Sequence, residues 1–418
     1  MNKYIKKYIL FMFLPLPPIE FDGKKWGPRL NIIQRFLLLL DFFNNSYKNN
    51  ISKIFLFLKH LISLVYLFIT LPFQTLIYFS KYRILDINFY QVGAFVQQLD
   101  CLIKSNELKK KKYRLILIAP KNLCVNNYIK NLYGNHIIIL NNFFTFLFLH
   151  PFTYSNICSV NPWKYEATNP NCDYNKLQKN YKKKFKNYLL PLIKQKSFVT
   201  DSFIVKNNID IKKFVCVHIR DDEFYGISSS RSSSIENIKK SIFFLIKKKI
   251  KVVRFIHKKT KKLKIKNPYY LELVVESEKE KEIQCNLIQL AKLIICSAGG
   301  INSMNVLSKA DFFCIDATQL NMMILTKSND MFILKRYYDK VSNKIIPLHS
   351  IFSKNLHLYP EQKNFFLKNN TKKEIFDVVK NIIYDKSRVN CKNIFNNKKF
   401  IKYSIYHTDA KLGFNFRY

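Results

Sequence analysis

The sequence has no cysteine pair of the CxxC type and no HExxH motif, and its nine cysteines are scattered along 418 residues. Structural zinc sites need clustered Cys and His ligands, and disulfide-stabilised domains need an even set of cysteines at recurring spacings. An odd number of dispersed cysteines therefore argues against both kinds of site. It fits a protein that stays in a reducing cytoplasm.

Motifs for nucleotides and nucleic acids are missing as well. The sequence contains no GxGxxG or GKS/GKT phosphate loop, and no RNP-like, KH or zinc-finger pattern. These absences exclude the common phosphate loops and give no support to a specific nucleic-acid partner.

Acidic residues are scarce, since 70 Lys and Arg stand against 28 Asp and Glu, which gives a formal charge of 70 − 28 = +42. Such a charge attracts anionic partners, namely nucleic acid, acidic membranes or phosphorylated substrates. Lys, Asn, Ile, Phe and Tyr are also encoded by AT-rich codons, and base composition is the simpler source of the excess. The charge alone therefore identifies no partner.

The N-terminal residues 1–80 are apolar. The run 61–79 has no charged side chain and is long enough to span a bilayer, although Pro72, Gln74 and Thr75 interrupt it. The residues before it mix apolar and charged side chains, as interfacial helices do. We therefore predict a helical region attached to the inner, cytoplasmic face of a membrane, aided by the lysine-rich body. A true span and the buried helices of a soluble domain are the alternatives.

After residue 80, short apolar runs alternate with polar segments of helix length. The runs are continuously apolar, as in strands of parallel sheets that are covered on both faces. Strands are predicted at 113–120, 136–141, 214–219, 251–256, 269–275, 293–297 and 311–316, and helices at 126–134, 175–187, 234–248 and 280–291.

Residues 150–200 lose this rhythm and are rich in Asn, Pro and aromatic residues, which predicts a long connector. The predicted fold class is α/β, with two Rossmann-like doubly wound domains and an apolar helical N-terminal region. The predicted units are the N-terminal region 1–80, a Rossmann-like domain with connector 81–205, a second Rossmann-like domain 206–390 and a tail 391–418.

The stretch FVCVHIRDDEFYG, residues 214–226, joins a buried strand to a dense cluster of charge. In an α/β unit, such a strand delivers the residues that follow it to the edge where ligands bind. Arginine offers a planar donor fork for phosphate oxygens, and a carboxylate can accept a proton from a hydroxyl. The alternative is a solvated turn beside a core histidine. The candidates are Arg220 and His218 for binding, and Asp222 or Glu223 as general base.

A second candidate site is SAGGINSMN, residues 297–305, which follows the apolar run LIICS. Two glycines between a strand and a helix let backbone amides approach a phosphate, and the helix N-terminus adds partial positive charge. Ordinary helix capping by a polar side chain explains the same residues equally simply. The candidates here are Gly299, Gly300, Asn302 and Ser303.

Two further arginines stand out. Arg231 follows a serine run and precedes a predicted helix, and Arg254 interrupts the apolar run KVVRFI. An arginine in a buried strand needs a partner, which is either a carboxylate of the protein or a ligand. Both alternatives stay open for Arg254.

The ordered series VHIRDDEFY, Arg231, KVVRF, LIICSAGG and DFFCID resembles a family of uncharacterised bacterial glycosyltransferases associated with surface-polysaccharide clusters. The resemblance covers about residues 80–350. More remotely, the H-x-R element is similar to that of fucosyltransferases of the two-Rossmann (GT-B) type. In those enzymes the arginine contacts the nucleotide diphosphate, a role that falls on Arg220. They place an acid five residues after the histidine, where this sequence has Glu223 instead of Asp.

The resemblance implies a membrane-associated glycosyltransferase that takes a sugar from a nucleotide diphosphate donor to a surface glycan or a lipid-linked acceptor. Its second domain would hold the donor, and Asn126 and the loop after Ile87 would serve the acceptor. The DxD motif of many metal-dependent sugar-nucleotide enzymes is absent, which favours a reaction without metal. Two other classes stay open: a non-enzymatic basic protein that binds membrane surfaces or nucleic acid, and another two-Rossmann transferase such as a pyruvyl transferase.

Overall fold

The structure is a computed structural model that describes residues 61–62, 65–154, 157–162, 165, 174–193, 197–221, 230–318, 327, 329–354, 356, 364–384 and 411–412. The predictions for residues 1–60 and for most of the tail fall outside the described residues. So do both candidate bases, Asp222 and Glu223.

The first sheet has four parallel strands in the order β3-β2-β1-β4. Helices follow its strands along the chain, as in any sheet built from right-handed crossovers. Its elements are α4 (Leu71–Phe79), β1 (Tyr82–Leu85), α5 (Val92–Leu108), β2 (Arg114–Ile118), α6 (Asn127–Leu132), β3 (Ile137–Leu140), α7 (Phe143–Leu149), the 3-10 helix η1 (His150–Tyr154) and β4 (Ser159–Val160).

The second sheet has seven parallel strands in the order β13-β10-β9-β8-β5-β6-β7. Its central strands are buried and apolar up to their last residues, His218 of β5 and Ser297 of β8, because helices cover both faces. The elements are β5 (Phe214–His218), α11 (Ile235–Lys247), β6 (Lys251–Ile256), β7 (Tyr270–Val274), α12 (Glu278–Leu290), β8 (Leu293–Ser297), α13 (Gly300–Ser303), the 3-10 helix η3 (Met304–Leu307), β9 (Asp311–Ala317), β10 (Met331–Leu334), α15 (Lys372–Tyr384) and β13 (Lys411–Leu412).

Both sheets share one winding pattern. In each, the first strand along the chain lies beside the second on one side and the fourth on the other, as in the Rossmann order 3-2-1-4. The predicted fold class is therefore confirmed: the chain is α/β with two Rossmann-like, doubly wound sheets, a GT-B-like architecture. The domain boundaries proposed above stay predictions.

Within the region predicted as a connector, 150–200, helix α8 (Tyr174–Phe185) confirms the helix predicted at 175–187. The region also contributes β4 to the first sheet, and helix α9 (Phe198–Lys206) begins at its end; neither was predicted. A two-residue strand leaves no readable pattern in a sequence, so β4 was missed. Strand β1 was missed because its run YRIL is short and begins with two side chains that carry polar groups, Tyr82 and Arg83. A small antiparallel pair, β11 (Arg336–Asp339) and β12 (Phe365–Lys368), and helix α14 (Leu348–Ser353) complete the described elements.

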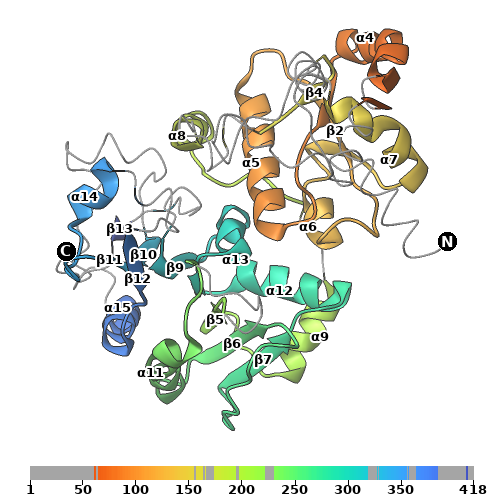
Figure 1. The fold of residues 1–418 in the computed structure, drawn as a ribbon. Coiled ribbons are helices and arrows are strands. Elements are labelled where there is room, and N and C mark those ends of the chain that lie inside the picture. The colour runs from red at the N-terminus through yellow and green to blue at the C-terminus, as the bar shows by residue number, and fades with distance from the viewer. Residues whose placement is uncertain are drawn as a thin grey trace, which may run out of the picture.

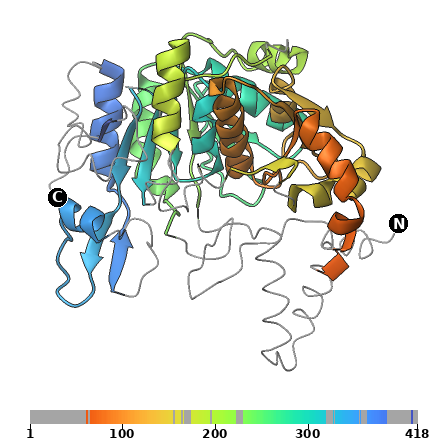
Figure 2. The ribbon, with the colours of Figure 1, turned by 90° about the horizontal axis from the view of Figure 1, so that it is seen from above.

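Helix α5 connects the two halves. It packs on α13 and η3 of the second half, and Figure 1 shows α5 beside α13; Figure 2 gives the view from above. On its other side, a fully buried ion pair between Asp100 and Lys104, 2.9 Å long, binds it to Gln178 of α8. One apolar core continues from the first sheet into one face of the second. The position of α5 is therefore set by both halves.

Among the described residues, no helix is both long enough and apolar enough to cross a membrane. The apolar stretch 61–79 is helical at 65–69 and again as α4, which begins with Pro72 in its first turn.

Candidate functional site

The candidate site lies at the carboxyl ends of β5 and β8. These neighbouring strands are where the strand order of the second sheet reverses, because β6 and β7 extend to one side and β9 and β10 to the other. Ligands of doubly wound sheets bind at such a switch point. We call this place, with Arg220, Ser297, Gly299 and Asn302, the switch-point site.

Arg220 lies two residues after the end of β5, and hydrogen bonds hold its backbone at both the N–H and the carbonyl. Its N–H donates to the buried Oγ of Ser297 at the end of β8, at 2.8 Å, and its carbonyl accepts from the N–H of Ser233 at 2.8 Å. Both bonds orient the arginine before any ligand arrives. The next residue, Asp221, is buried.

The segment that carries Arg231 is held by hydrogen bonds to the carboxylate of Asp316. Ser233 Oγ donates to Asp316 Oδ2 at 2.6 Å, and the backbone N–H of Asn370 donates to the other carboxylate oxygen. Burial raises the pKa of Asp316, while these hydrogen bonds and the nearby Lys335 act in the opposite direction. Asp316 also has a positive φ of 51°, a conformation that this network holds in place. Arg231 is half-buried, two residues from Ser233.

The two glycines do different things. A Cβ on Gly300 would lie 3.3 Å from the backbone nitrogen of Gly93 on α5, so Gly300 serves the contact between the two halves. A Cβ on Gly299 would meet nothing closer than 3.9 Å, so its backbone is open to a ligand. The helix that follows the glycines is a single turn, α13, followed by a 3-10 turn, η3. Its dipole is accordingly small.

Asn302 is fully buried, and neither its Oδ1 nor its Nδ2 atom has a hydrogen-bond partner among the described residues. Leaving a buried amide unpaired costs about 1–3 kcal/mol per group, so such groups need a reason. The amide can both donate and accept, which suits a ribose or sugar hydroxyl. Ser303 is buried beside Gly93.

His218 and Arg254 lie deeper. Burial, together with the nearby Arg254 and Arg220, lowers the pKa of His218 to about 4, so the ring is neutral at pH 7. Arg254 is buried and pairs with Glu272 of β7 at 2.8 Å. The structure thus shows the ion-pair alternative for Arg254, and its contact with a substrate stays a prediction.

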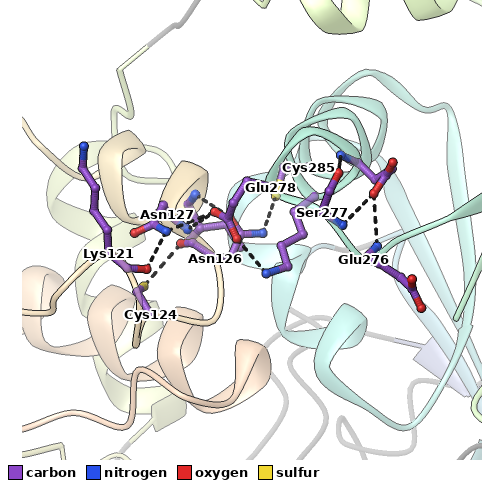
Figure 3. A network of polar contacts seen from close by, with 11 residues as sticks. Lys121, Cys124, Asn126, Asn127, Glu276, Ser277, Glu278 and Cys285 are labelled. Atoms are coloured by element: carbon purple, nitrogen blue, oxygen red, sulfur yellow. Dashed lines mark hydrogen bonds and ion pairs between the residues drawn. The ribbon is translucent and has the colours of Figure 1, made fainter. Parts of the chain in front are cut away.

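Asn126, assigned above to the acceptor side, lies in the contact between the halves (Figure 3). Its Oδ1 accepts from the Ile129 N–H as the N-cap of α6, and its Nδ2 reaches Cys285 Sγ of α12 at 3.5 Å. The neighbouring Asn127 donates its backbone N–H and its Nδ2 to Glu278 at 3.2 and 3.1 Å. Both Oδ1 and Nδ2 of Asn126 therefore have partners within the protein. A contact of Asn126 with the acceptor substrate stays a prediction.

The first sheet contributes residues that sequence reasoning missed. Asp86 directly follows β1 and is buried, so it lies at the carboxyl end of β1, as Arg220 lies near the carboxyl end of β5. The buried hydroxyl of Tyr90 has no hydrogen-bond partner among the described residues. The available signal was the run YRILD, which repeats the strand-then-charge pattern of VHIRD.

Metal ligands are not gathered anywhere in the described part of the chain, where no group of three or more His, Cys, Asp or Glu residues could hold an ion. The independence of the reaction from metal stays a prediction.

No family model matches the sequence, and no curated protein matches it significantly. Among solved structures, E. coli ADP-heptose lps heptosyltransferase II matches at 11% identity and a TM-score of 0.34, over 56% of this chain and 84% of that chain. E. coli heptosyltransferase WaaC matches at 10% and 0.33, over 60% and 92%. The iron-containing dodecameric glycosyltransferase TibC from enterotoxigenic E. coli matches at 11% and 0.36, over 58% and 62%.

These neighbours are heptosyltransferases or related glycosyltransferases, and they do not support the fucosyltransferase resemblance. At such low identities and TM-scores, the likeness carries no argument about activity. The function is therefore argued from the residues of this chain.

Proposed function

We propose that the chain is a glycosyltransferase that takes a sugar from a nucleotide diphosphate donor to a glycan or lipid-linked acceptor. The observation that carries the proposal is Arg220, whose backbone is fixed at both N–H and C=O at the switch point of a Rossmann-order sheet. An arginine whose backbone is fixed in advance can offer its donor fork to a diphosphate with a smaller loss of backbone conformational freedom.

Two neighbours support a nucleotide sugar over a bare anion. Gly299, two residues after the Ser297 that binds the Arg220 backbone, leaves open space for a ligand. Asn302 has a buried amide with no hydrogen-bond partner among the described residues, which suits a hydroxyl. Arg231, on the segment pinned by Ser233, adds positive charge from the β5–α11 connection. Together these groups match a ligand with a diphosphate and several hydroxyls.

The first sheet supplies the acceptor side of the proposal. Helix α5 begins beside α13, so the loop after Ile87 leads directly to the contact between the halves. Asp222, Glu223 and Asp86 are the candidate bases that would take the proton of the acceptor hydroxyl. With donor arginines in place, positive charge would stabilise the leaving diphosphate.

The decisive experiment is a thermal-shift titration of the detergent-solubilised protein with nucleoside diphosphates and their sugars, at high salt. A ligand that binds only the native state raises stability by RT ln(1 + [L]/Kd). We expect one nucleotide family to stabilise the protein. Arg220→Ala should weaken its binding at least about tenfold, because a charge-assisted hydrogen bond is lost. Arg220→Lys should fall between the two, since it keeps the charge and loses the fork.

Arg114→Ala is the matched control, because Arg114 is exposed at the start of β2, away from the switch point. It should leave nucleotide binding unchanged. Unaltered binding by Arg220→Ala would remove Arg220 from the donor site. No stabilisation by any nucleotide would instead favour a non-enzymatic surface-binding protein.

Turnover separates the remaining alternatives. The kcat should be measured for the variants Asp222→Asn, Glu223→Gln and Asp86→Asn. Their affinity for the donor should be measured as well, as the control for intact binding. Mass spectrometry of the product distinguishes a transferred sugar from another transferred group, such as pyruvyl.

A further inference from the structure

The first half of the molecule exposes an unusual apolar surface. Six large apolar side chains are each between 62% and 74% exposed. We call them the α4–α7 patch: Phe68, Ile69, Leu76, Phe79, Phe144 and Phe148. Contiguous exposed apolar surface of this kind marks an interaction site on a folded protein.

The two segments that carry the patch lie against each other. Tyr66 donates its hydroxyl to the Phe148 carbonyl at 2.6 Å, and the ring of Phe73 lies 6.2 Å from that of Phe152. The inner side of the helix is buried through Leu67 and Gln74. In a water-facing helix the outer side would be polar, yet residues 65–79 contain no charged side chain.

Basic residues border the end of α4. Lys81 is exposed, and its carbonyl accepts from the N–H of Arg114 at 3.0 Å. This hydrogen bond places the start of β2 next to Lys81. Lys110 and Lys111, just before β2, are exposed as well. These four residues form the basic cluster. Figures 1 and 2 place α4 at the end of the molecule away from α15.

We propose that the α4–α7 patch and the basic cluster together dock on an anionic phospholipid surface. Stable attachment of a peripheral protein needs two contributions, apolar insertion and electrostatic attraction, and the two features supply one each. Aromatic side chains suit the headgroup boundary. The proposal holds whichever reaction the chain performs.

Charge favours a bilayer over the two other possible occupants. Residues 1–60 carry ten Lys and Arg and three Asp and Glu, a net 10 − 3 = +7, so covering the patch with them would bring more positive charge to the basic cluster. A second copy would bring an identical basic cluster, and like charges repel. Anionic headgroups, in contrast, are attracted by the basic cluster and by the positive charge of residues 1–60.

The test is flotation of the full-length protein with vesicles of phosphatidylcholine alone or mixed with phosphatidylglycerol. We expect binding to the anionic vesicles only, reversed by high salt. The double variant Ile69→Ser/Phe79→Ser should bind at least about tenfold more weakly, because both side chains lose apolar burial. Lys110→Glu/Lys111→Glu should weaken binding similarly without touching the apolar face.

The matched control is Phe198→Ser/Val205→Ser on α9, where both side chains are also exposed, at 84% and 74%. It should float like the unaltered protein. Equal flotation of the patch variant and this control would overturn the proposal. The proposal would also be overturned if the patch variant floated normally but changed its melting temperature or oligomeric state in the absence of vesicles. That result would show that another part of the protein, or a second copy, covers the patch. Equal binding to neutral vesicles would overturn the electrostatic part. The lysine variant keeps the proposal testable if the patch variant misfolds.

Discussion

His218 ends strand β5 with an imidazole whose pKa is lowered to about 4 by burial and by Arg254 and Arg220. The same ring has a pKa of about 6.5 in an unfolded chain. Between these values the unfolded state binds more protons than the native state, so the native state loses stability as the pH falls. Arg220, two residues further along the chain, therefore has a neutral imidazole near it at pH 7.

We expect the free energy of unfolding to fall as the pH is lowered from about 6.5 to about 4, and the variant His218→Gln to lose part of this dependence. Each pKa unit corresponds to about 1.4 kcal/mol. Urea unfolding at several pH values measures the slope. Parallel slopes for the variant and the unaltered protein would show that His218 does not titrate in this range.

At the level of elements, the contact between α5 and α13 depends on two glycines. A Cβ on Gly93 would lie 3.0 Å from Gly300 Cα, which is backbone and cannot move aside cheaply. The two helices can therefore approach only because neither has a side chain at this point. This approach brings the first half next to the switch-point site.

A series of three alanine variants tests this assignment. Gly93→Ala should destabilise the protein by about 1–3 kcal/mol through overpacking, and Gly300→Ala by less. Gly299→Ala is the control for stability, since its Cβ has open space and its φ of 178° is extended. If Gly299 approaches the donor, its variant should weaken nucleotide binding while its melting temperature stays near that of the unaltered protein. A Gly299→Ala protein as unstable as Gly93→Ala would contradict the assignment.

At the scale of the whole molecule, the two sheets share one apolar core and a polar contact. The core runs from the first sheet through α5 into one face of the second sheet. The hydroxyl of Tyr128 on α6 donates to Asn286 of α12 at 2.7 Å. Asn127 and Glu278 form a second polar contact between the halves (Figure 3). Neither half therefore buries all of its apolar surface alone.

We expect the two halves to unfold together in one cooperative transition, because separating them would expose the shared core. Scanning calorimetry in detergent should give one endotherm whose van't Hoff and calorimetric enthalpies agree. Hydrogen exchange should give similar global protection for β1–β3 and for β5 and β8. Two resolved transitions would show that the halves are independent units.

Local patterns determined much of the secondary structure. Continuous apolar runs such as FVCVHI and LIICS identified β5 and β8, because strands covered on both faces need apolar side chains at every position. The short strands β1 and β4 could not be recognised, since their few residues join a sheet only through partners distant in the chain. For the same reason Asp86 was missed although Arg220 was found.

The sequence by itself determined the α/β class and the strand that delivers Arg220, because hydrophobic periodicity and strand-end chemistry are local properties. Only the tertiary structure decided what each candidate does. It placed Gly300 in the contact with α5, Asn126 between the halves and Arg254 in an ion pair with Glu272. Among the described residues, it showed no hydrogen-bond partner for the amide of Asn302. The physical reason is that burial, pairing and open space depend on residues far apart in the chain.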